Sequence, residues 1–205
     1  MTEAERLFKD VCKRVDEYKS KFIKQFIPTN PKVGPDEYEL EVKAFCLLSH
    51  AALEEFFEKI ALTVMSHSIE SWKKGKLSDT AIMLVGRYSL KYDIPEGDEI
   101  NEIRVYDHVR SMLEETKRRF SRDVHMNHGA SPRYLRALLV PVGIDFMPDV
   151  KSLNSLIQLS QQRGRYAHKG FVRSSISPED ALACVEDCLA FAMEIRNRAN
   201  QKLEV

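Results

Sequence analysis

The chain has 205 residues, of which 43% are hydrophobic and 30% are charged, a mixture typical of one globular domain with a sizeable core. Lysine and arginine total 31, as do aspartate and glutamate, so the formal net charge at pH 7 is zero. A neutral chain has no long-range field to attract nucleic acid or an acidic membrane, so any phosphate ligand must be bound by a local cluster of cations.

The first predicted helix covers residues 3–26, where apolar side chains recur at three- or four-residue steps. The next segment, FIPTNPKVGPD (26–36), contains three prolines and one glycine and is predicted to be a loop. From about residue 36 to residue 72 the apolar positions form a band wide enough for a central helix that packs on several sides.

Further helices follow the long one, separated by breaks rich in glycine, proline and serine. Ser78 is placed to cap the first of them, and Ser131 followed by Pro132 signals the start of a short one. The last helix begins at Ser177, which is followed by a proline and two acidic residues that favour the helix dipole. The intervening helices are predicted at about residues 80–93, 98–121, 133–143 and 149–167.

No segment shows the alternation of a strand, and the sequence has no internal repeat. We therefore predict an all-α fold of about six or seven helices, an antiparallel bundle with a long central helix pair. The whole chain, 1–205, is expected to form one domain, with the N-terminal helix in 1–27 and the remaining bundle in 36–203.

The cysteines and the hydropathy of the sequence indicate the cellular compartment of the protein. The longest apolar candidate, residues 44–65, is interrupted by four charged residues and is not a membrane span, and the charged first ten residues are not a secretory signal. The four cysteines form no CxxC pair, and Cys184 and Cys188 are predicted to be small buried side chains on one helix face. We expect a reduced, cytoplasmic protein without contact to a membrane.

Arg163 and His168, within QQRGRYAHKG (161–170), combine a phosphate-binding group with a proton-transfer group. Arginine binds phosphoryl oxygens through a rigid fork of donors and stays charged, whereas histidine titrates near pH 6.5 and exchanges protons. Such a pair suffices to cleave RNA without metal, because one group steadies the phosphate while the other moves protons as the ribose 2′-OH attacks. DNA lacks this hydroxyl, so the chemistry selects RNA.

The spacing of this pair constrains its geometry. Five residues on a regular helix separate two side chains by about 140°, so they converge only if the helix ends or bends near His168. Lys169 and Gly170 are predicted to supply that end and to fold His168 back toward Arg163. The spacing alone favours the alternative of a solvated helix face, where such pairs arise by chance.

The stretch RGRYAHKG (163–170), placed at a helix end before the last long helix, resembles the HEPN superfamily, whose signature is an arginine, four to six residues and a histidine. Two other parts of the chain resemble its RiboL-PSP-HEPN branch. They are EVKAFCLLSHAALEEFFEKI (41–60) and NHGASPRYLRALLVPVGID (127–145), the latter followed by LNSLIQL (153–159). The resemblance covers roughly residues 36–200.

This resemblance implies a homodimer in which the motifs of both subunits share one cleft. It implies a metal-independent endoribonuclease, commonly a bacterial toxin or a defence effector, that needs no cofactor and has RNA as its substrate. It assigns Arg163 and His168 as catalytic residues and Ala167 as the small residue before the histidine. Other members are catalytically silent and bind RNA, nucleotide or a partner protein, and a regulatory or antitoxin partner is compatible with either class.

The motif departs from the family pattern at two positions. Gly164 stands where active members often have Asn, Asp or His, which favours the silent alternative, as does the neutral net charge. Lys169 replaces the glycine that usually follows the histidine, and we predict that its added cation helps to hold phosphate.

Neighbouring residues are candidates for accessory roles. Arg165 is either a second phosphate ligand or an exposed cation, and Tyr166 either stacks on a base or packs at the helix end. The run KRRFSR (117–122) is either a solvated helix end or a basic rim that guides RNA. Glu54 lies among apolar residues of the long helix, and because a buried charge is costly unless paired, we predict a pair with an arginine of the motif helix.

Three further histidines invite a metal or catalytic interpretation. His125 and His128 have a spacing found in zinc sites, but the sequence offers few nearby ligands to complete one, so no metal is expected. We interpret them as part of a turn in which Gly129 adopts a left-handed conformation. His50, one helical turn before Glu54, is interpreted as a histidine at the edge of the core.

Overall fold

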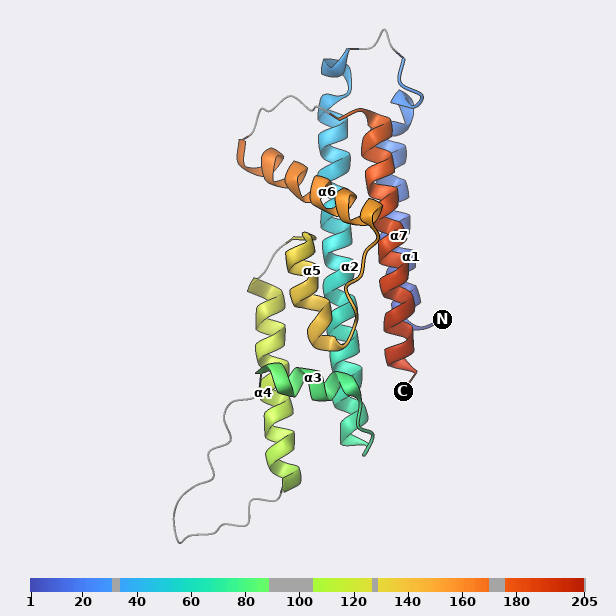
Figure 1. The fold of residues 1–205 in the computed structure, drawn as a ribbon. Helices are drawn as coiled ribbons and strands as arrows, with labels where there is room; N and C mark the ends of the chain where they lie inside the picture. The colour runs from blue at the N-terminus through green and yellow to red at the C-terminus, as the bar shows by residue number, and fades with distance from the viewer. Residues whose placement is uncertain (31–33, 89–104, 127–128, 170–175, 205) are drawn as a thin grey trace.

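The computed structural model describes the chain in five stretches, residues 1–30, 34–88, 105–126, 129–169 and 176–204. Of residues 105–108 and 165–169 it describes the backbone alone. The regular elements of these stretches are seven α-helices with a few short 3₁₀ or π-helical turns, and they include no strand (Figure 1). The predicted all-α fold is confirmed.

Helix α1 (Glu3–Tyr18) begins at a capping box in which the Thr2 hydroxyl accepts the Glu5 N–H at 3.1 Å and the Glu5 carboxylate accepts the Thr2 N–H at 2.8 Å. The predicted helix over 3–26 is right in extent, but its final part is a π-helical turn (Lys19–Ile23) followed by a 3₁₀ turn (Lys24–Phe26). This change of register leaves Ile23 completely buried.

Helix α2 (Glu39–Lys73) is the long helix predicted at 36–72, and it starts later because Pro35–Glu37 form a 3₁₀ turn. Its C-terminus is a Schellman motif. The N–H of Gly75 donates to the Trp72 carbonyl at 2.8 Å and the N–H of Lys76 donates to the Ser71 carbonyl at 3.0 Å. Gly75 has a φ of 81°, which a residue with a Cβ adopts only with strain.

Two long helices pack along α2 (Figure 1). Helix α1 runs antiparallel to it and forms the predicted antiparallel pair, whereas α7 (Pro178–Leu203) runs in the same direction as α2. The Thr2 hydroxyl also lies 2.7 Å from the Asn200 side-chain oxygen, which ties the start of α1 to the end of α7.

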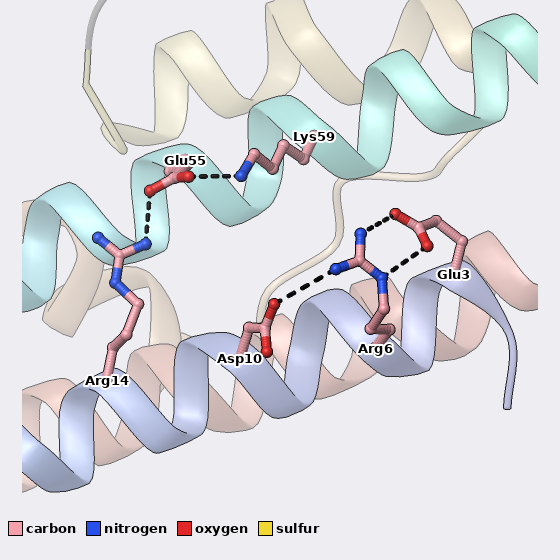
Figure 2. A network of polar contacts seen from close by, with 6 residues as sticks. All are labelled: Glu3, Arg6, Asp10, Arg14, Glu55 and Lys59. Carbon is pink, nitrogen blue, oxygen red and sulfur yellow. Dashed lines mark hydrogen bonds and ion pairs between the residues drawn. The ribbon is translucent and has the colours of Figure 1, made fainter.

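Charged side chains join α1 to α2 on the outer surface of this packing (Figure 2). Nη1 of Arg14 lies 2.5 Å from Oε2 of Glu55, and Nζ of Lys59 lies 2.5 Å from Oε1 of the same carboxylate. A groove of about 260 Å³ runs beside these pairs. Because the paired side chains are partly exposed, each pair contributes at most about 1 kcal/mol, and burial of the apolar stripe of α1 is the larger stabilising effect.

The remaining helices cover the other side of α2. Helix α6 (Val150–Lys169) crosses its N-terminal half, and three helices lie beside its C-terminal half, namely α3 (Asp79–Tyr88), α4 (Val105–Met126) and α5 (Pro132–Leu139) (Figure 1). The predicted serine caps are confirmed at Ser78, Ser131 and Ser177, whose hydroxyls accept backbone N–H groups at 3.1–3.3 Å.

The boundaries of α4 differ from the prediction. The helix was expected to stop near residue 121, but it continues to Met126, so the basic run 117–122 lies inside it. The reason is that Phe120 and Val124 are buried one turn apart, and this apolar contact carries the helix onward. Residues 98–104 of the predicted helix, and 89–93 of the one before, lie outside the described stretches.

The interior contains three cysteine thiols that form no disulfide. Cys46, Cys184 and Cys188 are at most 5% exposed, and the buried location predicted for the last two is confirmed. Burial raises the pKa of Cys46 to about 12, so this thiol stays protonated. Across the described stretches, no helix combines the length and the apolar character that crossing a membrane requires.

Candidate active site on helix α6

Arg163 and His168 both belong to the C-terminal part of α6, which is helical through Lys169. The Arg163 side chain is half-buried. The side chains of Arg165, Tyr166, His168 and Lys169 lie outside what the structure describes, as does Gly170, so the predicted return of His168 toward Arg163 stays a prediction.

A row of polar side chains on α2 lies on the side of the helix that faces α5 and the backbone before it. The row consists of His50, Glu54 and Glu58, which are four residues apart and therefore share one helix face. We call these three residues the polar row. His50 is 1% exposed, and the Glu54 side chain is 15% exposed.

Both ring nitrogens of His50 have a neighbour. Its Nε2 accepts a hydrogen bond from the backbone N–H of Ala130 at 3.2 Å, and its Nδ1 lies 3.6 Å from Oε2 of Glu54. In a neutral imidazole the nitrogen that accepts carries no hydrogen, so the proton resides on Nδ1 and faces the carboxylate.

The other end of the polar row is bonded to α5. The Tyr134 hydroxyl donates to Oε1 of Glu58 at 2.8 Å. Burial, this hydrogen bond and the charges of Glu58 and Glu54 all raise the pKa of Tyr134, so the phenol stays a donor at any physiological pH.

Arg163 belongs to α6, and this helix packs against α2, which carries the polar row. Burial, with a smaller contribution from the charge of Arg163, lowers the pKa of His50 to about 4. The pairing predicted between Glu54 and an arginine of the motif helix stays a prediction. The side chains that the structure describes at this candidate site are therefore Arg163 on α6 and the polar row on α2.

The structure differs from the sequence-based interpretation at part of the polar row. His50 was interpreted as a residue at the core edge, but it is fully buried and makes specific polar contacts. Glu58 and Tyr134 were not identified as candidates. The available signal was the four-residue spacing of three polar groups on a largely apolar helix, a pattern that places them on one face.

The remaining candidates from the sequence are the basic run 117–122 and the histidine pair with zinc-like spacing. Within the basic run, Arg118 and Arg119 both pair with Glu115, whereas Phe120 is in the core. A role of this run as a rim for RNA remains a prediction. His125 is exposed on α4, and the residues that the structure describes contain no group of three or more potential metal ligands. Its partner in the proposed spacing, His128, lies outside the described residues.

Gly164 provides a test of the motif helix. A Cβ added at this glycine would meet no described heavy atom within 4 Å, so we expect Gly164→Ala to raise the free energy of unfolding by about 1 kcal/mol through helix propensity. Urea denaturation followed by circular dichroism measures the change. Gly86→Ala in α3 is a matched control, because its Cβ would also meet open space. A gain at Gly86 without a gain at Gly164 would contradict an ordinary helical backbone at the motif.

The comparisons with known proteins identify the family of the chain. The RiboL-PSP-HEPN family model matches residues 8–201, from within α1 to the last turns of α7. The match therefore includes the N-terminal helix, which the resemblance over 36–200 had left out. No curated protein and no solved structure matches the chain. Since the matched region covers nearly the whole sequence and the fold is all-α, the chain belongs to the RiboL-PSP-HEPN family.

Proposed function

We propose that the protein is a metal-independent endoribonuclease that acts as a homodimer, with Arg163 and His168 of both subunits in one cleft. The observation that carries the proposal is the arginine of the family motif on α6, a helix that packs against α2, the helix of the polar row. Membership of the family supports the pairing of this arginine with His168.

In the proposed reaction one His168 takes the proton of the ribose 2′-OH, and the 2′-oxygen forms a bond to phosphorus. The bond from phosphorus to the 5′-oxygen breaks, and the second His168 gives a proton to that leaving oxygen. The products are a 2′,3′-cyclic phosphate and a 5′-hydroxyl. Arg163 stabilises the charge that builds up on the nonbridging oxygens.

Accessory groups would extend the site along the RNA. Arg165 and Lys169 add cations for neighbouring phosphates, Tyr166 offers a ring on which a base stacks, and Glu54 restrains Arg163. A cytoplasmic toxin or defence effector controlled by a partner protein is the setting that suits such a nuclease.

The competing function is a silent module of the same family that binds RNA, nucleotide or a partner. Gly164 beside the motif arginine and the neutral net charge favour it.

Incubation of the purified protein with total RNA in EDTA separates the two functions. The nuclease is expected to produce fragments with 2′,3′-cyclic phosphate ends, and light scattering is expected to show a dimer. An oligonucleotide with 2′-O-methyl groups is the control, since it can be bound but not cleaved. Uncleaved RNA that is nevertheless shifted on a native gel would support the silent module and contradict the nuclease.

A further inference from the structure

We propose that the exposed face of α4 is a second RNA-binding surface, which holds the phosphate backbone of a strand away from the motif on α6. The surface consists of Glu115, Arg118, Arg119 and Arg122, which we call the arginine cluster. The inference deepens the proposed function, because it names a surface that holds the RNA substrate, but its test does not depend on cleavage.

The arginine cluster carries an excess of positive charge. Residues 115–122 contain four cations and one anion, in a chain whose formal net charge is zero. Nε of Arg119 donates to Oε1 of Glu115 at 2.8 Å, and Arg118 forms an ion pair with Oε2 of the same carboxylate. Arg122 lies one turn after Arg118 on the same helix face. One carboxylate therefore serves a face that carries three guanidinium groups.

The other acids of this part of α4 contact neighbouring helices. From residue 109 to the end of the helix they are Glu114 and Asp123. The Glu114 carboxylate lies 3.2 Å from Nζ of Lys73 on α2, and the Asp123 carboxylate accepts a hydrogen bond from the Tyr88 hydroxyl of α3 at 2.9 Å. These contacts direct both carboxylates toward the bundle.

The cations of the cluster are accessible, and the helix that carries them is anchored. The Arg118 side chain is 77% exposed, and Arg122 is exposed as well. The opposite face of α4 is in the core through three apolar side chains, Leu113, Phe120 and Val124. Helix α4 therefore presents the guanidinium groups from a fixed position.

A phosphate group can take the place of the Glu115 carboxylate. Ion pairs at the surface are weak because water screens the charges and because two long side chains must be ordered. Arginine binds a phosphate through two parallel hydrogen bonds, and a strand of RNA offers several phosphates at once. The cluster therefore gains more from RNA than it loses by releasing Glu115.

The pattern favours RNA over an acidic membrane as the partner. A helix that binds a membrane surface places bulky apolar side chains beside its cations, and these enter the bilayer. In α4 the apolar side chains Phe120 and Val124 are instead buried in the bundle. The exposed cations are thus suited to a polyanion that approaches from solvent.

The place of α4 in the fold suits a strand that also reaches the motif. Helix α4 leads into α5, which contacts α6, the motif helix. In Figure 1 the C-terminal ends of α4 and α6 both lie to the left of α2. A strand bound at the motif can therefore continue along this side of the molecule to the arginine cluster.

The test is the salt dependence of binding to a 2′-O-methyl oligonucleotide, which cannot be cleaved. In the double variant Arg118→Gln/Arg122→Gln we expect the affinity at low salt to fall on the order of tenfold. The plot of log K against log salt should become less steep by about 1.4, since each phosphate contact with a single strand contributes about 0.7. Glu115→Gln should bind more tightly than the wild type, because the competing carboxylate is gone.

The matched control is the double variant Arg6→Gln/Lys13→Gln on α1. These two side chains are 51% and 75% exposed, and their replacement changes the net charge by the same amount. The control should keep the affinity and the salt slope of the wild type. Glutamine has a helix propensity close to that of arginine and lysine, so all variants should stay folded, which circular dichroism verifies.

Kinetics give a second measurement. The Arg118→Gln/Arg122→Gln variant should cleave a long RNA with a raised KM and an unchanged kcat, because the cluster binds the strand but does not touch the reacting atoms. Its KM for a dinucleotide should equal that of the wild type, since a dinucleotide has no further backbone to place on α4.

Equal losses of affinity in the two double variants would show an effect of net charge alone and would overturn the proposal. So would a wild type that does not bind the oligonucleotide at low salt, or a variant that loses affinity only for phosphatidylserine vesicles. The proposed nuclease is judged separately. A wild type that binds but does not cleave RNA contradicts the nuclease and leaves the cluster in place, whereas a wild type that cleaves RNA, beside a cluster variant of normal affinity, does the reverse.

Discussion

Replacing His168 with alanine is expected to lower the rate of RNA cleavage in EDTA by about 10²- to 10⁴-fold, the usual contribution of a positioned acid–base group. Without the imidazole, the 2′-OH must lose its proton to water and the leaving oxygen must depart without a proton donor. Helix α6 should stay folded, since its attachment to the core depends on Leu156 and Leu159, which are both 1% exposed.

The experiment compares single-turnover rates on a defined RNA, together with light scattering to confirm that the dimer persists. His125→Ala is the matched control, because this histidine is exposed on α4 and belongs to neither the motif nor the polar row. It should cleave RNA at the wild-type rate. If His168→Ala cleaved as fast as the control, the assignment of the histidine as a catalytic residue would be refuted.

The free energy of unfolding is expected to decrease by about 2 kcal/mol between pH 7.0 and pH 4.5 because of the titration of His50 alone. In the folded protein the pKa of His50 is lowered to about 4, against an ordinary value of 6.5. The unfolded chain therefore takes up a proton as the pH falls below 6.5, while the folded chain does not until the pH approaches 4. The contribution of the neutral His50 to stability is therefore present above about pH 6.5 and is lost as the pH falls from 6.5 toward 4.

Carboxylates also titrate in this range, so the quantity to measure is the difference in pH dependence between the wild type and His50→Gln. Urea denaturation at several pH values gives the free energy of unfolding for each. The glutamine does not titrate and keeps the acceptor for the Ala130 N–H, so any constant difference in stability cancels. Parallel curves for the two proteins would show that His50 titrates normally in the folded state.

Local signals were sufficient to predict most of the helices. The caps at Ser131 and Ser177 depend on residues within one turn of each helix start, and the long α2 depends on a pattern of apolar residues within the helix itself. The errors occur where distant packing prevails over local preference. Burial of Val124 extends α4 beyond the predicted end, and burial of Ile23 accompanies the π-helical turn after α1.

The same division applies to the site. Arg163 and His168 could be selected as candidates from the sequence because both lie within one short segment, where residue type and spacing indicate phosphate chemistry. The polar row could not be recognised in the same way, since His50 accepts a hydrogen bond from a backbone N–H 80 residues away. Periodicity shows which face of a helix is buried, but the packing of α2 against α5 and α6 selects the groups that meet there, because those contacts depend on how whole helices cross.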